Sequence, residues 1–249
     1  MENLIVIGFP ETYEPATDRN VCPTKMERKR IAIYGGTFDP VHSGHLEIAR
    51  RVTLLFEIDE FLFVPARVAP HKFDREVSPA LHRYAMLALA TNAEPRLCIC
   101  TFELDGPGRQ YTVDTLLYFR SRFGESTDLF FVMGADSWAE ITTWYEWHRL
   151  LTLTNLIVVT RPGYEISAKQ VDAETAARVV DLRDSLTDGS VSTIGDNRQK
   201  IFVTDAVMLD VSATDIRRAA ENNSDELNSL VPSEVAEYIR KYQLYRKQA

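Results

Sequence analysis

The sequence predicts an α/β protein with an open parallel sheet, helices on both faces and a C-terminal helical segment. Short apolar, β-rich runs alternate with amphipathic helical patterns along the chain, at the spacing of roughly 30 residues that one βαβ unit occupies. Most of the runs are continuously apolar rather than alternating, as is typical of parallel strands that are covered on both faces. The helical patterns between them would supply the crossovers that parallel strands need.

The expected strands are apolar runs bounded by turn residues or by helical patterns. They span Arg30–Tyr34, Glu60–Val64, Leu97–Thr101, Asp128–Met133, Leu156–Thr160 and Lys200–Val203. Ligands of such sheets bind beyond the carboxyl ends of the strands. We therefore expect the functional residues at those ends.

The expected helices show apolar periodicity and start signals. Ser78 and Pro79 should begin one helix, as its N-cap and its first residue, and Thr112 should cap another. Earlier in the chain, one helical stripe carries Leu46, Ala49, Thr53 and Phe56. A C-terminal helix from Pro232 to Tyr245 would place on one side Val235, Tyr238, Ile239 and Tyr242.

The length of 249 residues suits one large domain or at most two small ones. We interpret residues 26–249 as that single domain and residues 1–25, which are rich in turn and polar residues, as an N-terminal extension of unknown role. The polar stretch 165–199 is interpreted as a variable peripheral excursion, with a helix over Ala168–Leu186.

Charge and composition argue against several classes of protein. The formal net charge of −8 does not fit a broad nucleic-acid-binding surface, which is usually basic. No apolar run approaches the roughly 18 residues that would indicate a membrane-spanning helix. Three cysteines without a secretory signal indicate reduced thiols in a cytoplasmic protein.

The first strand-to-helix turn carries the strongest functional pattern. Gly35-Gly36 ends a strand, and Ser43-Gly44-His45 opens a helix whose free amides and dipole favour an anion. His42 and His45 flank this helix start, so both imidazoles can face one phosphate-sized volume. A P-loop and a dinucleotide fingerprint are absent from the turn. Two histidines and one carboxylate, Asp39, make a poor metal ligand set.

The run GGTFDPVHSGH, from Gly35 to His45, resembles the first motif of the bacterial nicotinate mononucleotide adenylyltransferases. These enzymes belong to the HxGH nucleotidyltransferase superfamily, with the phosphopantetheine adenylyltransferases and the cytidylyltransferases. The resemblance extends from about Arg30 to Tyr245 and is weak across residues 165–199. It implies a Rossmann-like fold and AMP transfer from ATP to nicotinate mononucleotide, giving nicotinate adenine dinucleotide and pyrophosphate in NAD biosynthesis.

The resemblance also implies a set of site residues. His42 and His45 would be catalytic, and Mg²⁺ would accompany ATP, held mostly by phosphate oxygens and water. The implied ATP-binding residues are Gly35, Gly36, Thr37, Phe38, Gly44, His45, Gly134, Asp136, Arg161, Ser212, Thr214 and Arg217. The implied nicotinate nucleotide-binding residues are Thr37, Arg67, His71, Lys72, Tyr111, Thr112, Asp136 and Trp144.

Physical chemistry supports several of these implied roles. Ser212 and Thr214 begin a helix and Arg217 lies one turn in, which together suit a second polyphosphate site. An acid at a strand end, such as Asp136, can accept hydrogen bonds from a ribose diol. A tryptophan such as Trp144 can stack on a pyridine ring.

Alternatives remain open at the acceptor side. Ala66-Arg67 stands where the family usually has an asparagine-containing pair, and Arg67 could take over an anion contact. His71 and Lys72 could equally form a solvated basic loop, and Trp144 could be a core residue. The enzyme could prefer nicotinamide mononucleotide or use another phosphate such as phosphopantetheine, or the chain could be a non-catalytic nucleotide sensor.

Overall fold

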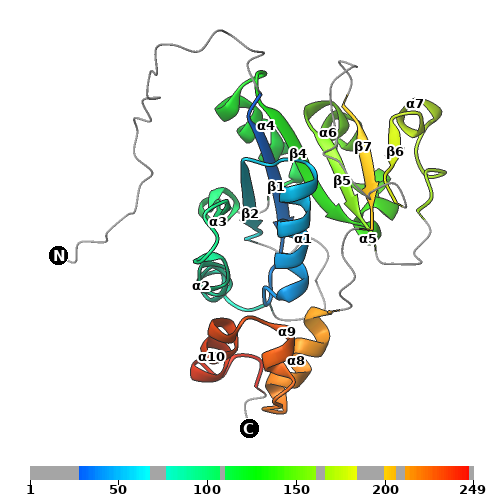
Figure 1. Ribbon diagram of the computed structural model, residues 1–249. Helices are drawn as coiled ribbons and strands as arrows, with labels where there is room; N and C mark the ends of the chain where they lie inside the picture. The colour runs from blue at the N-terminus through cyan, green and yellow to red at the C-terminus, as the bar shows by residue number, and fades with distance from the viewer. Residues whose placement is uncertain are drawn as a thin grey trace, which may run out of the picture.

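The computed structural model describes residues 28–67, 77–106, 110–160, 166–183, 199–205 and 211–246 (Figure 1). The strands are β1 (Arg30–Gly36), β2 (Glu60–Pro65), β3 (Leu97–Ile99), β4 (Asp128–Gly134), β5 (Asn155–Val159), β6 (Val179–Asp181) and β7 (Ile201–Thr204). The helices are α1 (Ser43–Leu55), α2 (Ala80–Thr91), α3 (Phe102–Asp105), α4 (Thr112–Phe123), α5 (Ala135–Ala139), the 3₁₀ turn η1 (Ile141–Thr143), α6 (Trp147–Leu153), α7 (Ala173–Ala176), α8 (Ala213–Glu221), α9 (Leu227–Leu230) and α10 (Ser233–Lys241).

Within those ranges the strands form one sheet of seven strands in the order β3-β2-β1-β4-β5-β7-β6. Every neighbouring pair is parallel. From β1 the chain builds outward through β2 to β3, and then it returns to the other side of β1 to build β4 and β5. The direction of winding therefore reverses between β1 and β4, and in such sheets the carboxyl ends at the reversal flank the ligand crevice.

Each face of the sheet has its own hydrophobic core. Side chains alternate across a strand, so Ala32 of β1 faces one core while Ile31 and Ile33 face the other. Residues of α1, α2, α8, α9 and α10 cover the first face. Residues of α4, α5, η1 and α6 cover the second. The prediction of a Rossmann-like open parallel sheet with helices on both faces is confirmed.

The expected strands occur where the sequence placed them, with ends that differ by one or two residues. The helix expected over Ala168–Leu186 is wrong. Within the described part of the segment, up to residue 183, the only helix is the short α7, and Val179–Asp181 then pairs with β7 as the edge strand β6, with Val179 opposite Ile201. Two β-branched residues beside an unpaired strand edge outweigh a weak local helix preference.

Two predicted helix starts are also wrong in detail. Pro79, not Ser78, is the N-cap of α2, and it is extended at φ −49° and ψ 142°. The backbone of Ser78 is used elsewhere, because its N–H donates to Asp39 Oδ2 at 3.3 Å. Thr112 is the first residue of α4 rather than its cap, since Tyr111 is the N-cap and its N–H donates to Asp114 Oδ2.

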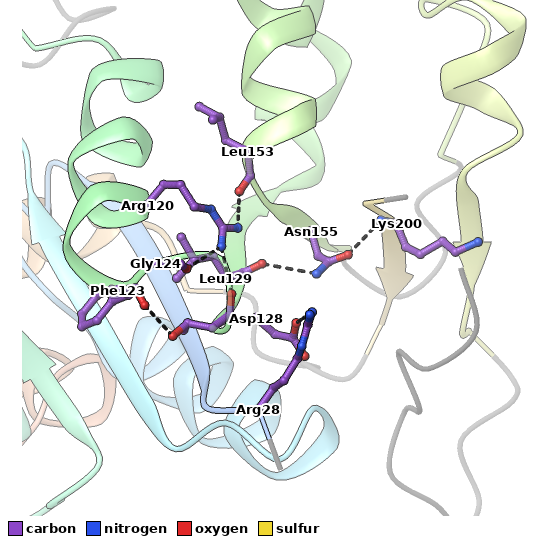
Figure 2. Close-up of polar contacts among 10 residues, drawn as sticks. Arg28, Arg120, Phe123, Gly124, Asp128, Leu129, Leu153, Asn155 and Lys200 are labelled. Carbon is purple, nitrogen blue, oxygen red and sulfur yellow. Dashed lines mark hydrogen bonds and ion pairs between the residues drawn. The ribbon is translucent and has the colours of Figure 1, made fainter. Parts of the chain in front are cut away.

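The amino ends of the strands are held by hydrogen bonds from two polar residues, the partly buried Arg120 and the buried Asn155 (Figure 2). Arg120 of α4 donates to three carbonyl oxygens, those of Gly124 at 3.1 Å, Thr127 at 2.9 Å and Leu153 at 2.6 Å. The buried Asn155 accepts from the N–H of Lys200 at 2.9 Å and so ties β5 to the chain that enters β7. This end of the sheet is occupied by structural hydrogen bonds.

The C-terminal segment lies at one end of the molecule, where α8, α9 and α10 gather beneath α1 and α2 in the view of Figure 1. Helix α10 contacts α2 and buries Val235 and Ile239, as the sequence pattern predicted, while Tyr242 remains 48% exposed. The predicted C-terminal helix is thus present, although it ends at Lys241 and continues as turns to Tyr245. None of the helices in the described ranges is long and apolar enough to span a membrane.

Candidate active site

In the turn that follows β1, the backbone at Gly36 lies very close to the side chain of Phe38. A Cβ placed on Gly36 would lie 2.8 Å from the ring of Phe38, so a side chain at Gly36 would require the ring to move. Phe38 has a φ of 48°, in the left-handed region that residues other than glycine rarely adopt. His42 then returns to extended backbone as the N-cap of α1. The conformation of the turn brings the histidines to the carboxyl end of β1.

His42 and His45 lie against each other, with ring centroids 3.6 Å apart and an interplanar angle of 31°. The backbone N–H of His42 donates to Nδ1 of His45 at 3.2 Å. An imidazole nitrogen that accepts a hydrogen bond carries no proton, so the neutral ring of His45 carries its proton on Nε2. A Cβ on Gly44 would lie 3.1 Å from Nδ1 of His42, which explains the small residue between the histidines. The pair therefore presents at least one oriented N–H donor.

An aromatic wall supports His45 from the sheet side. The ring of Phe38 contacts it edge-on at a centroid distance of 5.1 Å, and Tyr34 lies at 5.9 Å. Burial raises the pKa of Tyr34 well above its ordinary value, so its hydroxyl stays neutral. The wall fixes the orientation of His45 without adding a charge beside it.

The second predicted anion motif, at the start of α8, meets this turn directly. Ser212 is the N-cap of α8, and its hydroxyl accepts from the N–H of Asp215 at 3.1 Å. Arg217 Nη2 donates to the hydroxyl of Thr214 at 3.0 Å, and Arg217 Nη1 donates to the backbone carbonyl of Asp39 at 2.9 Å. The fold thus brings together two motifs that lie at opposite ends of the domain sequence.

Between the motifs lies a group of residues that we name the Asp39 cluster: Asp39, Ser78, Arg83, Arg217 and Tyr245. The sequence analysis predicted a site role for Arg217 but missed the contribution of Arg83 and Tyr245. Asp39 is 3% exposed and accepts from the hydroxyl of Tyr245 at 2.7 Å. Arg83 is 1% exposed; burial lowers the pKa of its guanidinium, and the charge of Asp39 opposes that shift in part. An arginine on the same apolar stripe as Met86 and Leu87 was the sequence signal for this cluster.

Arg83 joins three separate segments. Its Nη1 donates to the carbonyl of Thr37 at 2.8 Å, Nε to that of Ser78 at 3.0 Å and Nη2 to that of Arg67 at 3.4 Å. The loops after β1 and β2 and the start of α2 are therefore held at fixed relative positions.

The residues after β4 border the same end of the sheet. β4 pairs with β1, with Val132 opposite Tyr34, so Gly134, two residues further along, is level with Gly36 at the end of β1. Gly134 is exposed, and among the described residues, its two chain neighbours aside, no atom lies within 4 Å of a Cβ placed on it. Asp136 is exposed in the first turn of α5. Both predicted residues thus lie at the winding reversal and are accessible.

The residues predicted to bind the nicotinate nucleotide are more widely separated than those of the two anion motifs. Arg67 is exposed, and its Nη1 donates to the carbonyls of Leu104 and Gly106 at 2.9 and 3.0 Å. Tyr111 is 40% exposed, and Thr112 follows it at the start of α4. Trp144 is half-buried and meets Phe131 of β4 edge-on, at 6.3 Å and 74°. The remaining predicted residues, which lie outside the described ranges, are His71, Lys72 and Arg161.

The side chains at the site do not form a metal-binding group. Among the described residues, no group of three or more histidine, cysteine, aspartate or glutamate side chains could hold a metal ion. The histidine pair is backed by aromatic rings and a backbone N–H rather than by carboxylates. The part of the site that the structure describes is therefore suited to an anion.

Known proteins with similar sequences show the family to which the chain belongs. The cytidylyltransferase-like family model matches residues 33–219. A probable nicotinate-nucleotide adenylyltransferase of Thermoanaerobacter sp. is 38% identical over 223 residues, which are 89% of this chain and 97% of that protein. One of Nocardioides sp. is 37% identical over 85% of this chain and 91% of that protein.

Solved structures share the fold. The nicotinic acid mononucleotide adenylyltransferase of Plasmodium falciparum, complexed with NaAD, matches with a TM-score of 0.63 and 19% identity over 87% of this chain and 97% of that one. The same protein complexed with APC matches with a TM-score of 0.62.

Proposed function

The chain belongs to the nicotinate-nucleotide adenylyltransferases of the cytidylyltransferase-like family, and we propose that it transfers AMP from ATP to nicotinate mononucleotide. The products are nicotinate adenine dinucleotide and pyrophosphate, in a step of NAD biosynthesis. The observation that carries the proposal is the bond from Arg217 to the carbonyl of Asp39, which places the α8 motif beside the histidine turn. Two anion-binding motifs in one place suit a polyphosphate substrate.

The chemistry needs no protein nucleophile. The phosphate of nicotinate mononucleotide attacks the α-phosphorus of ATP in line, a P–O bond forms, and the bond to the β-phosphate oxygen breaks to release pyrophosphate. Catalysis is then positioning plus stabilisation of charge on the transferring group. We assign this stabilisation to His42 and His45, with the Nε2–H of His45 as one donor. A preorganised donor of this kind is typically worth about 3 kcal/mol.

We assign the departing pyrophosphate to the second motif. The guanidinium of Arg217 and the hydroxyls of Ser212 and Thr214 supply donors, and the N-terminus of α8 adds its dipole. The rest of the ATP site would be formed by Gly35, Gly36, Thr37, Phe38, Gly44, Gly134, Asp136 and Arg161.

We assign the acceptor nucleotide to the loops beyond β2 and β4. Trp144 would stack on the pyridine ring, and Tyr111 and Thr112 would bind the nicotinate carboxylate at the start of α4. Thr37, Arg67, His71, Lys72 and Asp136 complete the proposed set. Because one Arg67 nitrogen already donates to two carbonyls, a role for Arg67 would use its other guanidinium N–H groups.

Nucleotidyltransferases that act on ATP generally use a divalent metal ion, and we propose Mg²⁺ here. The described residues offer no carboxylate cage, which fits an ion bound through phosphate oxygens and water. When bound, the ion would neutralise charge on the polyphosphate.

Two further proposals concern the chain as a whole. We propose that residues 26–249 form one domain and that residues 1–25 are an extension of it. We propose a cytoplasmic location, which the free thiols of Cys98 and Cys100 support because cytosolic thiols stay reduced.

A pyrophosphate-release assay with ATP and a panel of acceptors tests the proposed function. The panel contains nicotinate mononucleotide, nicotinamide mononucleotide and phosphopantetheine, and the adenylylated product is identified by mass. We expect the highest kcat/KM with nicotinate mononucleotide. A higher value with either other acceptor would replace the substrate assignment, and release with none of them would favour the nucleotide sensor.

A further inference from the structure

We propose that Tyr245 is a positioning residue for ATP: its hydroxyl anchors the buried carboxylate of Asp39, and Asp39 in turn orients the histidine turn and Arg217. The inference rests on the proposed function, because it concerns the same ATP site. It assigns a role in the reaction to the last turn of the described chain, which is remote in sequence from the first motif.

The anchor is a short hydrogen bond between buried groups. The hydroxyl of Tyr245 donates to Oδ1 of Asp39 at 2.7 Å, while Oδ2 accepts the N–H of Ser78 at 3.3 Å. Asp39 is 3% exposed, so solvent cannot substitute for a lost donor. Burial, with the nearby charge of Asp39, raises the pKa of Tyr245, so the phenol keeps the proton that it donates.

The backbone at Tyr245 is also strained. Its φ is 67°, in the left-handed region that a bulky aromatic residue rarely adopts. Such conformations persist only where surrounding contacts enforce them. The contact that Tyr245 makes with Asp39 spans 206 positions of the sequence and fixes the end of the C-terminal segment against the first turn.

Asp39 links this anchor to both phosphate motifs. It lies three residues before His42, so its position sets the path of the chain into α1. Its backbone carbonyl accepts from Arg217 Nη1 at 2.9 Å, which holds the guanidinium beside the turn. Loss of the Tyr245 hydroxyl would therefore disturb the histidines and Arg217 together, and both are assigned to ATP rather than to the acceptor.

Tyr245→Phe tests the proposal, because it removes one oxygen and keeps the ring. We expect kcat/KM for ATP to fall by about tenfold, the effect of losing one hydrogen bond to a charged group, while KM for nicotinate mononucleotide stays within about twofold. Tyr242→Phe is the matched control, since Tyr242 lies on the same segment and is 48% exposed. Unchanged kcat/KM for ATP in Tyr245→Phe, or an equal change in the KM of both substrates, would overturn the proposal.

A double-mutant cycle tests whether the hydroxyl acts through Asp39. In an Asp39→Ala background, Tyr245→Phe should cause no further loss of kcat/KM for ATP, and independent multiplicative losses would refute the linkage. If Asp39→Ala does not fold, Asp39→Asn replaces it, and the effect of Tyr245→Phe should then shrink because the acceptor is uncharged. Binding of a non-hydrolysable ATP analogue to each variant is measured separately. An inactive wild type that still binds the analogue would refute the proposed function, whereas equal analogue affinity in the wild type and Tyr245→Phe would count against this inference.

Discussion

Arg83 offers the sharpest test of how the loops around the site are held. It is 1% exposed, and it donates to the carbonyls of Thr37 and Ser78 at 2.8 and 3.0 Å. Arg83→Met keeps a similar apolar stem but removes every donor. Hydrogen bonds to charged groups contribute about 1.5–3 kcal/mol each, and we count only these two, because the bond to Arg67 is longer at 3.4 Å.

Relief from burying a charge offsets part of that loss. We therefore expect Arg83→Met to lower the free energy of unfolding by about 2–4 kcal/mol. At roughly 2–4 °C per kcal/mol for a chain of this size, the Tm should fall by roughly 5–15 °C. Differential scanning calorimetry measures the change.

Two further variants separate the possible causes. Arg51→Met is the matched control, because Arg51 is exposed and, within the described part of the chain, pairs along its own helix with Glu47, which is worth less than about 1 kcal/mol. Arg83→Lys keeps the charge but not the planar donor fork, so its Tm should lie between those of the wild type and Arg83→Met. A Tm for Arg83→Met that matches the Arg51→Met control would refute the reasoning.

The remaining predictions concern Gly134 and Glu103. Because no described atom beyond its chain neighbours lies within 4 Å of a Cβ on Gly134, Gly134→Ala should leave the Tm unchanged and raise KM for ATP severalfold; an unchanged KM would remove ATP from this position. Burial raises the pKa of Glu103, although a hydrogen bond from Thr115 lowers it in part. With the folded pKa above the unfolded value, the stability from this group is present at low pH and is lost as pH rises through the folded pKa. The Tm of Glu103→Gln minus that of the wild type, from thermal melts at about pH 4 and pH 7, should therefore increase with pH, and a difference independent of pH would contradict the assignment.

The sheet was predictable because strands that are buried on both faces are continuously apolar in sequence. Residues such as Ile31, Ala32 and Ile33 are all fully buried, and their continuous apolar run showed this directly. The histidine turn was predictable for a similar reason, since its glycines, its helix start and both imidazoles lie within one short segment. Features encoded by neighbouring residues can be read from one sequence.

Features that depend on distant partners could not be read in this way. Val179–Asp181 forms a strand because it pairs with β7 at the edge of the sheet. The pairing of Tyr245 with Asp39 depends on the fold that brings the chain end to the first turn. The hydrogen-bond partners of the Arg67 guanidinium could not be predicted either, because the carbonyls of Leu104 and Gly106 lie beside it only in the folded chain.

The central claim, that the β1–α1 turn carries the chemistry, is tested most directly by the single-turnover rate of dinucleotide formation in His45→Ala. With saturating ATP and nicotinate mononucleotide, we expect a loss of two to three decades, the usual effect of removing one preorganised donor. His148→Ala is the matched control, since the side chain of His148 is 70% exposed and pairs with Asp172. A circular dichroism spectrum identical to that of the wild type would show that the fold is intact. A single-turnover rate near that of the wild type in His45→Ala would contradict the account.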